Sequence, residues 1–169
     1  MGLKVLKKEG AIKSKDLETA GKISTDMVDN LGFRLRLAQN LVFKDFNERF
    51  AELSLTQSLW SVLILIEGNP GLRQADLGAP LGIQQANLVE LIETLVSRGV
   101  IKRVPLPTDR RSQGLHLTAE GVELMARGWK VHRGHIDYLH TRISSEADYR
   151  LLTDLLQRLI AGPDQSPGA

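Results

Sequence analysis

The stretch that follows Gly82 carries side chains suited to contacting nucleic-acid bases. Amide groups offer a donor and an acceptor side by side, and this pair matches the N6/N7 edge of adenine. Small apolar side chains can touch thymine methyl groups, and a carboxylate can accept a hydrogen bond from cytosine N4. The predicted base-reading residues are Gln84, Gln85, Ala86, Asn87, Val89 and Glu90. The alternative is that they are solvated residues of an ordinary surface helix.

Positive charge is concentrated in two segments. Residues 98–111 hold five Lys or Arg against one Asp, and residues 1–22 hold six Lys against three acidic residues. Cations of the first segment suit contacts to phosphate groups, which fix the register of a protein on DNA without reading its sequence. The predicted backbone contacts are Arg73, Lys102, Arg103 and Arg110. The alternative is a solvated basic hairpin.

Two short helices must position these side chains. Apolar spacing predicts one helix over Arg73–Leu81 and a second over Gln84–Arg98, with Gly82 in the bend between them and Gly99 ending the second. This arrangement is typical of a helix-turn-helix, whose second helix lies in the DNA major groove. Two strands, Val100–Val104 and Gly114–Leu117, are predicted to follow, joined through Pro105, Pro107 and a charged tip.

Longer helices flank this unit. We expect them over Thr25–Arg49, Leu55–Ile66 and Thr118 to about Arg142, with Ser54 or Thr56 capping the second and Trp60 facing inward. A last helix after Ser145 is rich in leucine and has little to pack against in its own subunit, which indicates a partner. The predicted parts of the chain are a basic arm (1–24), a helical dimerisation region (25–54 and 118–161), a winged helix-turn-helix domain (55–117) and a flexible tail (162–169).

Composition excludes several classes of protein. The chain has 169 residues, of which 42% are hydrophobic and 25% charged, as in an ordinary globular domain. It has no Cys, which excludes disulfides, thiol chemistry and cysteine-based metal sites. No apolar run reaches the roughly 20 residues that a membrane span needs, and no signal sequence is visible, so we expect a cytoplasmic protein with no membrane partner.

Nothing in the sequence predicts catalysis. His132 and His135 share a helical face and His140 follows, but Asp137 is the one carboxylate close by, so surface histidines without a special role explain them better than a metal site. Phosphate-binding glycine loops, a Ser-His-Asp spacing and paired catalytic acids are not found in the sequence. We therefore expect no enzyme, no metal and no cofactor.

From about Leu55 to Gly121 the chain resembles the MarR family of winged helix-turn-helix transcriptional regulators. The matching landmarks, in order and register, are Leu55-Thr56, Trp60, Leu63, Leu77, Leu81-Gly82, Leu95, Arg98-Gly99, Asp109-Arg110-Arg111 and Leu117-Thr118-Ala119-Glu120-Gly121. The chain departs from the usual family pattern at Arg73 and Gln84, where helix-capping residues are common, and at Glu90, where a basic residue is common.

The resemblance implies roles for further residues. Arg111 resembles the family's minor-groove arginine, with Asp109 bracing it through a charge-assisted hydrogen bond. It also implies a homodimer and a cleft that binds a small anionic organic effector, such as an aromatic acid or an acyl-CoA thioester. The candidate effector-binding residues are Arg34, Arg36, Gln39, Asn40, Lys44, Trp60, His132, Arg133 and His135. Each of them can equally be a salt-bridged surface residue.

Taken together, these features predict a mainly α protein with a small β-hairpin wing: a winged helix-turn-helix domain and a helical dimerisation region. The predicted function is sequence-specific regulation of transcription by a homodimeric repressor that binds a pseudo-palindromic operator in double-stranded DNA and is released by the effector. The alternative is a winged-helix adaptor that binds proteins without DNA sequence specificity.

Overall fold

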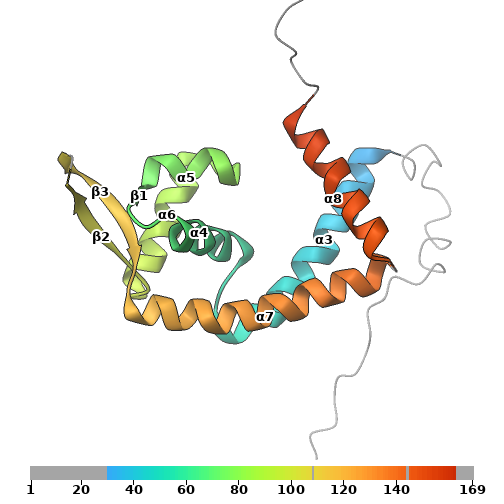
Figure 1. Cartoon of the computed structure of the whole chain (residues 1–169), viewed down its shortest axis with the longest axis horizontal. Helices are drawn as coiled ribbons and strands as arrows, with labels where there is room; N and C mark the ends of the chain where they lie inside the picture. The colour runs from blue at the N-terminus through green and yellow to red at the C-terminus, as the bar shows by residue number, and fades with distance from the viewer. Residues whose placement is uncertain (1–29, 108, 144, 163–169) are drawn as a thin grey trace, which may run out of the picture. The chain divides into compact units, whose positions relative to one another are not determined.

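The computed structural model describes residues 30–107, 109–143 and 145–162, with the backbone alone for residues 109–111. The chain divides after Leu41 into two units. Its described elements, shown in Figure 1, are α3 (Leu31–Phe50), η1 (Ala51–Leu53), α4 (Gln57–Gly68), β1 (Leu72–Arg73), α5 (Gln74–Leu81), α6 (Gln85–Ser97), β2 (Ile101–Leu106), β3 (Asp109–Leu117), α7 (Ala119–Ile143) and α8 (Glu146–Ala161). The predicted class, mainly α with a small β wing, is confirmed.

The first long helix begins later than the sequence pattern indicates. Oδ1 of Asn30 accepts a hydrogen bond from the backbone N–H of Phe33 at 3.2 Å, and such a contact satisfies one of the free amides at a helix start. Asn30 itself is not helical, so the prediction of one continuous helix from Thr25 is wrong at this end. Residues 25–29 lie outside the described part of the chain.

Helix α4 forms the centre of the second unit. Thr56, rather than Ser54, caps it, because Oγ1 of Thr56 accepts from the backbone N–H of Leu59 at 3.3 Å. Ser54 instead adopts a left-handed conformation, with φ of 51°, directly after η1. Trp60 is buried as predicted.

The core of this unit gathers apolar side chains from six helices and the sheet. Burial of such groups is the main favourable contribution to folding. Its largest fully buried members are Trp60, Phe46, Phe50, Leu63, Ile66, Leu77, Leu88, Ile92, Leu95, Ile101, Leu115 and Met125.

Two glycines end the helices of the predicted helix-turn-helix. Gly82 follows α5 with φ of 61°, and Gly99 follows Arg98 at the end of α6 with φ of 70°. After each glycine, the backbone N–H of the next residue donates to a carbonyl oxygen of the helix. Ile83 donates to Gly78, and Val100 donates to Leu95. Glycine adopts this left-handed conformation with little strain, so the positions of Gly82 and Gly99 determine where α5 and α6 end.

The sheet differs from the predicted hairpin. Its order is β1-β3-β2, all antiparallel, and β1 was not predicted. Strands β2 and β3 are longer than expected, because Pro105 pairs with Gln113 inside the ladder and a bulge follows it. A proline is tolerated there since β2 is an edge strand, where an N–H can be lost without breaking the ladder. The residues predicted to form a charged tip, from Asp109 onward, therefore begin β3.

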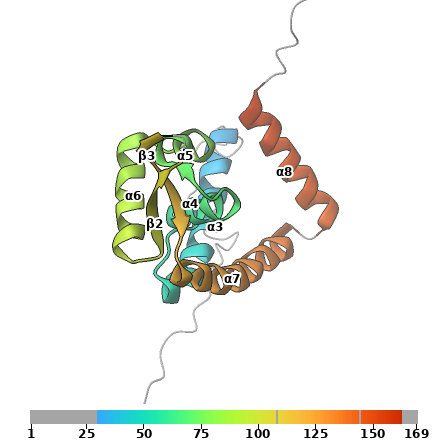
Figure 2. The same cartoon turned by 60° about the vertical axis from the view of Figure 1, so that its left-hand side comes forward.

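Helices α7 and α8 complete the second unit. The hydroxyl of Thr118 caps α7 by accepting from Gly121 N–H at 3.0 Å, and that of Ser145 caps α8 by accepting from Asp148 N–H at 3.0 Å. At the corner between these helices the rings of His140 and Tyr149 stack with centroids 3.9 Å apart. Figure 2 shows α8 standing away from the α4–α6 group, and no residue of α8 is buried within the described chain.

The end of α6 is joined to the turn that follows α3. Arg98 donates from Nη1 to the carbonyl oxygen of Ser54 at 2.7 Å and from Nη2 to that of Leu53 at 2.9 Å. Both bonds connect segments that lie more than forty residues apart in the sequence.

Candidate nucleic-acid interface

Helix α6 has one buried face and one exposed face. The buried face packs against the rest of the second unit and is formed by Leu88, Ile92 and Leu95. Every predicted base-reading residue is exposed. Ala86 and Glu90 lie opposite the buried stripe, while Gln85 and Asn87 lie on its two flanks. The first turns of α6 therefore present amide, methyl and carboxylate groups on a rigid support.

An open hollow of about 610 Å³ lies between the start of α4 and α6. Three of the base-reading candidates, Gln84, Asn87 and Glu90, line this hollow. The other three do not. The remaining lining residues are Thr56, Ser58, Leu59, Gly82, Ile83, Leu91 and Thr94. Polar side chains thus share this hollow with the apolar Leu59, Ile83 and Leu91.

The candidate phosphate contacts differ in their surroundings. Lys102 is exposed and makes no ion pair with any described residue. Arg103 pairs with Glu93 of α6 at 2.6 Å, and Arg73 pairs with Asp76 at 2.9 Å. The hydrogen bond from Arg73 lowers the pKa of the Asp76 carboxyl, although partial desolvation opposes this, so the pair stays ionised.

The wing residues implied by the family resemblance are placed only by their backbone. Asp109, Arg110 and Arg111 form the first part of β3, and Asp109 is opposite Leu106 of β2. Their side chains lie outside the described part of the structure.

The candidate effector-binding residues fall into two groups. Arg34, Arg36, Gln39 and Asn40 belong to the first unit. The other candidates lie in the second, where Lys44 is exposed and 4.0 Å from Glu48, and Arg133 is exposed on α7. Trp60, His132 and His135 lie close together, with ring centroids 5.9 Å apart for the first two and 6.1 Å for the two histidines.

An aromatic cluster surrounds Trp60. The ring of Phe50 lies 5.2 Å from it and that of Trp129 lies 5.1 Å from it. Gly128 makes this packing possible, because a Cβ there would come within 2.3 Å of the Trp60 ring. Trp129 was missed in the sequence, although its spacing of three residues before His132 places it on the same face of a helix.

Two polar atoms of this cluster are buried without a hydrogen-bond partner. They are Nε1 of Trp60 and Nδ1 of His132, and Oε1 of Gln57 at the start of α4 is a third such atom. Buried polar groups in native proteins are nearly always hydrogen-bonded to protein or to ordered water, so each of these atoms can take a further partner. Burial lowers the pKa of His132, as does the nearby His135, so its ring is neutral at pH 7.

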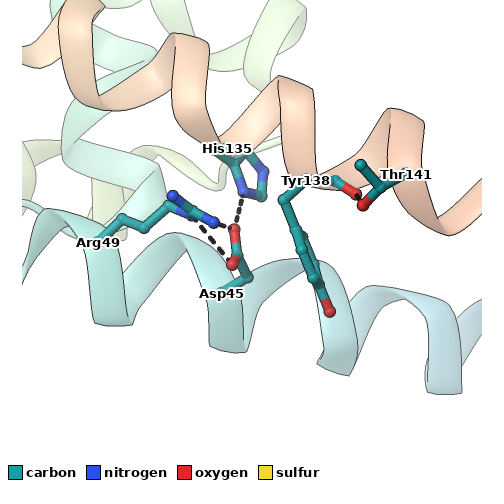
Figure 3. Close-up of polar contacts among 5 residues, drawn as sticks. All are labelled: Asp45, Arg49, His135, Tyr138 and Thr141. Atoms are coloured by element: carbon teal, nitrogen blue, oxygen red, sulfur yellow. Dashed lines mark hydrogen bonds and ion pairs between the residues drawn. The ribbon is translucent and has the colours of Figure 1, made fainter. Parts of the chain in front are cut away.

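His135 has a partner inside the protein. Figure 3 shows its Nδ1 directed at the Asp45 carboxylate, with 2.6 Å between Nδ1 and Oδ2. Arg49 donates from Nε to both oxygens of the same carboxylate, at 3.0 and 2.8 Å. Burial opposes ionisation of Asp45, but hydrogen bonds from Arg49 and His135 outweigh it and lower the pKa of the carboxyl. His135 thus joins α7 to α3, and the interpretation of it as a surface histidine without a special role is wrong.

Comparison with known proteins assigns the family. The family model for the MarR family matches residues 55–113. A curated relative from Thauera aromatica, named as a candidate transcriptional regulatory protein for the hcr operon, is 31% identical over 92% of this chain and 93% of its own. The chain belongs to the MarR family.

Solved structures of MarR-family proteins agree. The repressor CouR bound to a 23-mer DNA duplex is 34% identical, covers 83% of this chain and 98% of its own, and superposes with a TM-score of 0.74. CouR bound to p-coumaroyl-CoA is 30% identical, covers 82% and 97%, and has a TM-score of 0.75. Since MarR-family members are transcriptional regulators, the expectation that this chain is not an enzyme is confirmed.

Within the described residues, no group of three or more His, Asp or Glu is arranged to hold a metal ion. No single described helix is long and apolar enough to cross a membrane. Two described segments joined at a bend, Leu31–Leu53 and Gln57–Gly68, are together long and apolar enough for a span. The second of them, however, is the buried core helix α4.

Proposed function

We propose that this MarR-family protein is a cytoplasmic, homodimeric repressor that binds a pseudo-palindromic operator through α6 and the wing. A small organic effector releases it. The observation that carries the proposal is the exposed start of α6, whose amide groups are held on a fully buried leucine and isoleucine face. CouR, which is similar over most of this chain, has been solved on a DNA duplex.

In this proposal the exposed residues of α6 contact base edges in the major groove. Arg111 enters the adjacent minor groove with Asp109 bracing it, and Arg110 and Lys102 contact phosphates. The recognition helices of the two subunits would then bind half-sites about 10–10.5 base pairs apart.

Arg111→Ala is expected to weaken binding to duplexes from the protein's own promoter region by roughly 1–3 kcal/mol. The lost interaction is that of a guanidinium with the negative potential of a narrow minor groove. Fluorescence anisotropy with labelled duplex measures it. Lys130→Ala on α7 removes the same charge away from the wing and serves as the control. Unchanged affinity for Arg111→Ala refutes the wing assignment, and a wild-type protein that binds no duplex favours the adaptor.

The aromatic cluster is the proposed effector site. Its rings suit a planar apolar group, and Nε1 of Trp60 and Nδ1 of His132 can satisfy the polar group of such a ligand. Arg49 is already neutralised by Asp45, so an anionic part of the effector would be held by other cations of the second unit. Lys44 and Arg133, which are both exposed, are the candidates within this unit. CouR bound to p-coumaroyl-CoA supports an acyl thioester or aromatic acid.

His132→Ala is expected to weaken binding of p-coumaroyl-CoA about three- to tenfold, because one hydrogen bond is lost. Tryptophan fluorescence follows the titration, since Trp60 and Trp129 both lie beside His132. His140→Ala, in the same helix but stacked on Tyr149, is the control. If neither p-coumaroyl-CoA nor p-coumarate changes the fluorescence, this ligand class is wrong. If both histidine variants lose affinity equally, the site is wrong.

A further inference from the structure

One ion pair connects the recognition helix to the wing. Nη2 of Arg103, on β2, lies 2.6 Å from Oε1 of Glu93 on α6, and Nη1 lies 3.5 Å from Oε2. The two side chains meet in the fork geometry that guanidinium and carboxylate groups prefer. The hydrogen bond from Arg103, and then its charge, lower the pKa of the Glu93 carboxyl, so both groups are ionised at pH 7.

The place of this pair bears on DNA binding. Glu93 lies one helical turn after Glu90, on the exposed face of α6, and Arg103 is in register with Leu115 in the wing. In the proposed complex α6 lies in a major groove and the wing in the next minor groove. The phosphate strand that separates these grooves would then run across the surface where α6 meets β2, which carries the pair.

A carboxylate is an unexpected group at this place. Phosphates repel it, and a DNA-binding surface gains affinity from each cation that neutralises a phosphate. The side chain of Glu93 is 58% exposed, whereas that of Arg103 is 27% exposed. In this pair the acid is therefore the more exposed partner, and the cation is the more buried one.

We infer that Glu93 withholds Arg103 from the DNA backbone and so limits the sequence-independent part of the affinity. This inference rests on the proposed function, because it presupposes that α6 and the wing bind duplex DNA. Arg103 then supplies no phosphate contact in the wild-type protein, and the operator is selected with one fewer contact that any sequence could satisfy. Glu93 is a specificity-determining residue that acts through Arg103.

The salt dependence of binding tests this directly. Each phosphate neutralised by a cation contributes about 0.9 to the slope of log K against log salt concentration. A labelled duplex of mixed sequence serves as probe, so that base reading does not enter. Four proteins are compared: wild type, Glu93→Gln, Arg103→Gln and the double variant. Circular dichroism checks that each protein is folded. Arg103→Met, which removes the charge but keeps a long apolar side chain, serves as a second variant that lacks the cation.

Glu93→Gln is expected to steepen the salt slope by about 0.9. It should also tighten binding about two- to fivefold, as expected for release of an exposed ion pair. Arg103→Gln alone is expected to leave the slope unchanged, and the double variant should return to the wild-type slope. Glu90→Gln removes the same charge from the same helix face, and we expect the slope gain of Glu93→Gln to exceed that of Glu90→Gln by about 0.9.

Three results would overturn the inference. The first is a shallower slope for Arg103→Gln alone, which means that Arg103 already contacts a phosphate. The second is a gain for Glu93→Gln that persists in the double variant or equals that of Glu90→Gln, since charge alone then explains it. The third is an unchanged slope for Glu93→Gln. In all three the wild-type protein still binds duplex, whereas no binding by wild type would refute the proposed function as well.

Discussion

Leu155→Asp is expected to convert the protein from dimer to monomer and to weaken operator binding by about a hundredfold or more, because two linked half-site contacts become one. Leu151, Leu152, Leu155 and Leu159 share one arc of α8 and are each roughly half exposed, with Leu155 at 48%. A leucine stripe that no other described residue covers is typical of an interface. Light scattering measures the mass, and anisotropy with promoter duplex measures the affinity.

The matched control for this variant lies in the same helix. Gln157 is exposed on the side of α8 opposite Leu155, so Gln157→Asp adds the same charge without meeting the leucine stripe. We expect Gln157→Asp to remain a dimer with wild-type affinity. A monomeric wild-type protein, or equal loss of mass in both variants, would contradict the proposed dimer.

Asp45→Ala is expected to lower the free energy of unfolding by about 3 kcal/mol, because removal of one partner leaves a buried polar group unpaired. The side chains of Asp45 and His135 are only 14% and 5% exposed. Urea denaturation followed by tryptophan fluorescence, at one fixed protein concentration, measures the loss. Glu48→Ala, one residue from Arg49 but in an exposed pair with Lys44, should change stability by less than about 0.5 kcal/mol.

The same comparison has a defined dependence on pH. Since the folded protein lowers the pKa of Asp45 below its usual 3.8, the carboxylate stabilises the fold above that value and the stabilisation is lost as pH falls below it. The difference between wild type and Asp45→Ala should therefore be constant near neutral pH and shrink below about 3.8. A difference that grows on acidification would contradict the ionised Asp45.

Sequence periodicity predicted the bounds of helix α6 to within one residue at each end. Leu88, Ile92 and Leu95 recur at helical spacing, and Gly82 and Gly99 bracket the segment, so local signals and tertiary burial agree. The starts of α7 and α8 were predicted at Thr118 and after Ser145, and the hydroxyls of both residues accept hydrogen bonds from amides three residues on. Signals confined to one turn of helix can be read from sequence alone.

The sheet could not be predicted in the same way. Strand β1 has two residues, too few for an alternating pattern, and it exists because Leu72 and Arg73 pair with a strand forty residues later. Pro105 indicated a loop, but its place on an edge strand is a property of the sheet order. Both features depend on contacts distant in sequence.

The candidate sites show the same division. The exposure of the base-reading candidates follows from the helical pattern that buries Leu88 between them. The pairing of Glu93 with Arg103, and of Asp45 with His135, joins elements whose relative placement no local pattern contains. The family resemblance made His135 a candidate for effector binding, whereas the structure pairs it with the carboxylate of Asp45.

The two bonds from Arg98 to Ser54 and Leu53 bear on how a distant signal can reach the operator. A guanidinium is planar, so its two donors keep a fixed position relative to each other. The carbonyl oxygens of Ser54 and Leu53 are therefore held together at the end of α6. The turn at Leu53 directly follows the end of α3, which carries the stacked Phe46 and Phe50 rings, so these bonds join the end of α3 to the end of α6. In the proposed function, a movement of this end of α3 on effector binding would reach α6 through the two bonds.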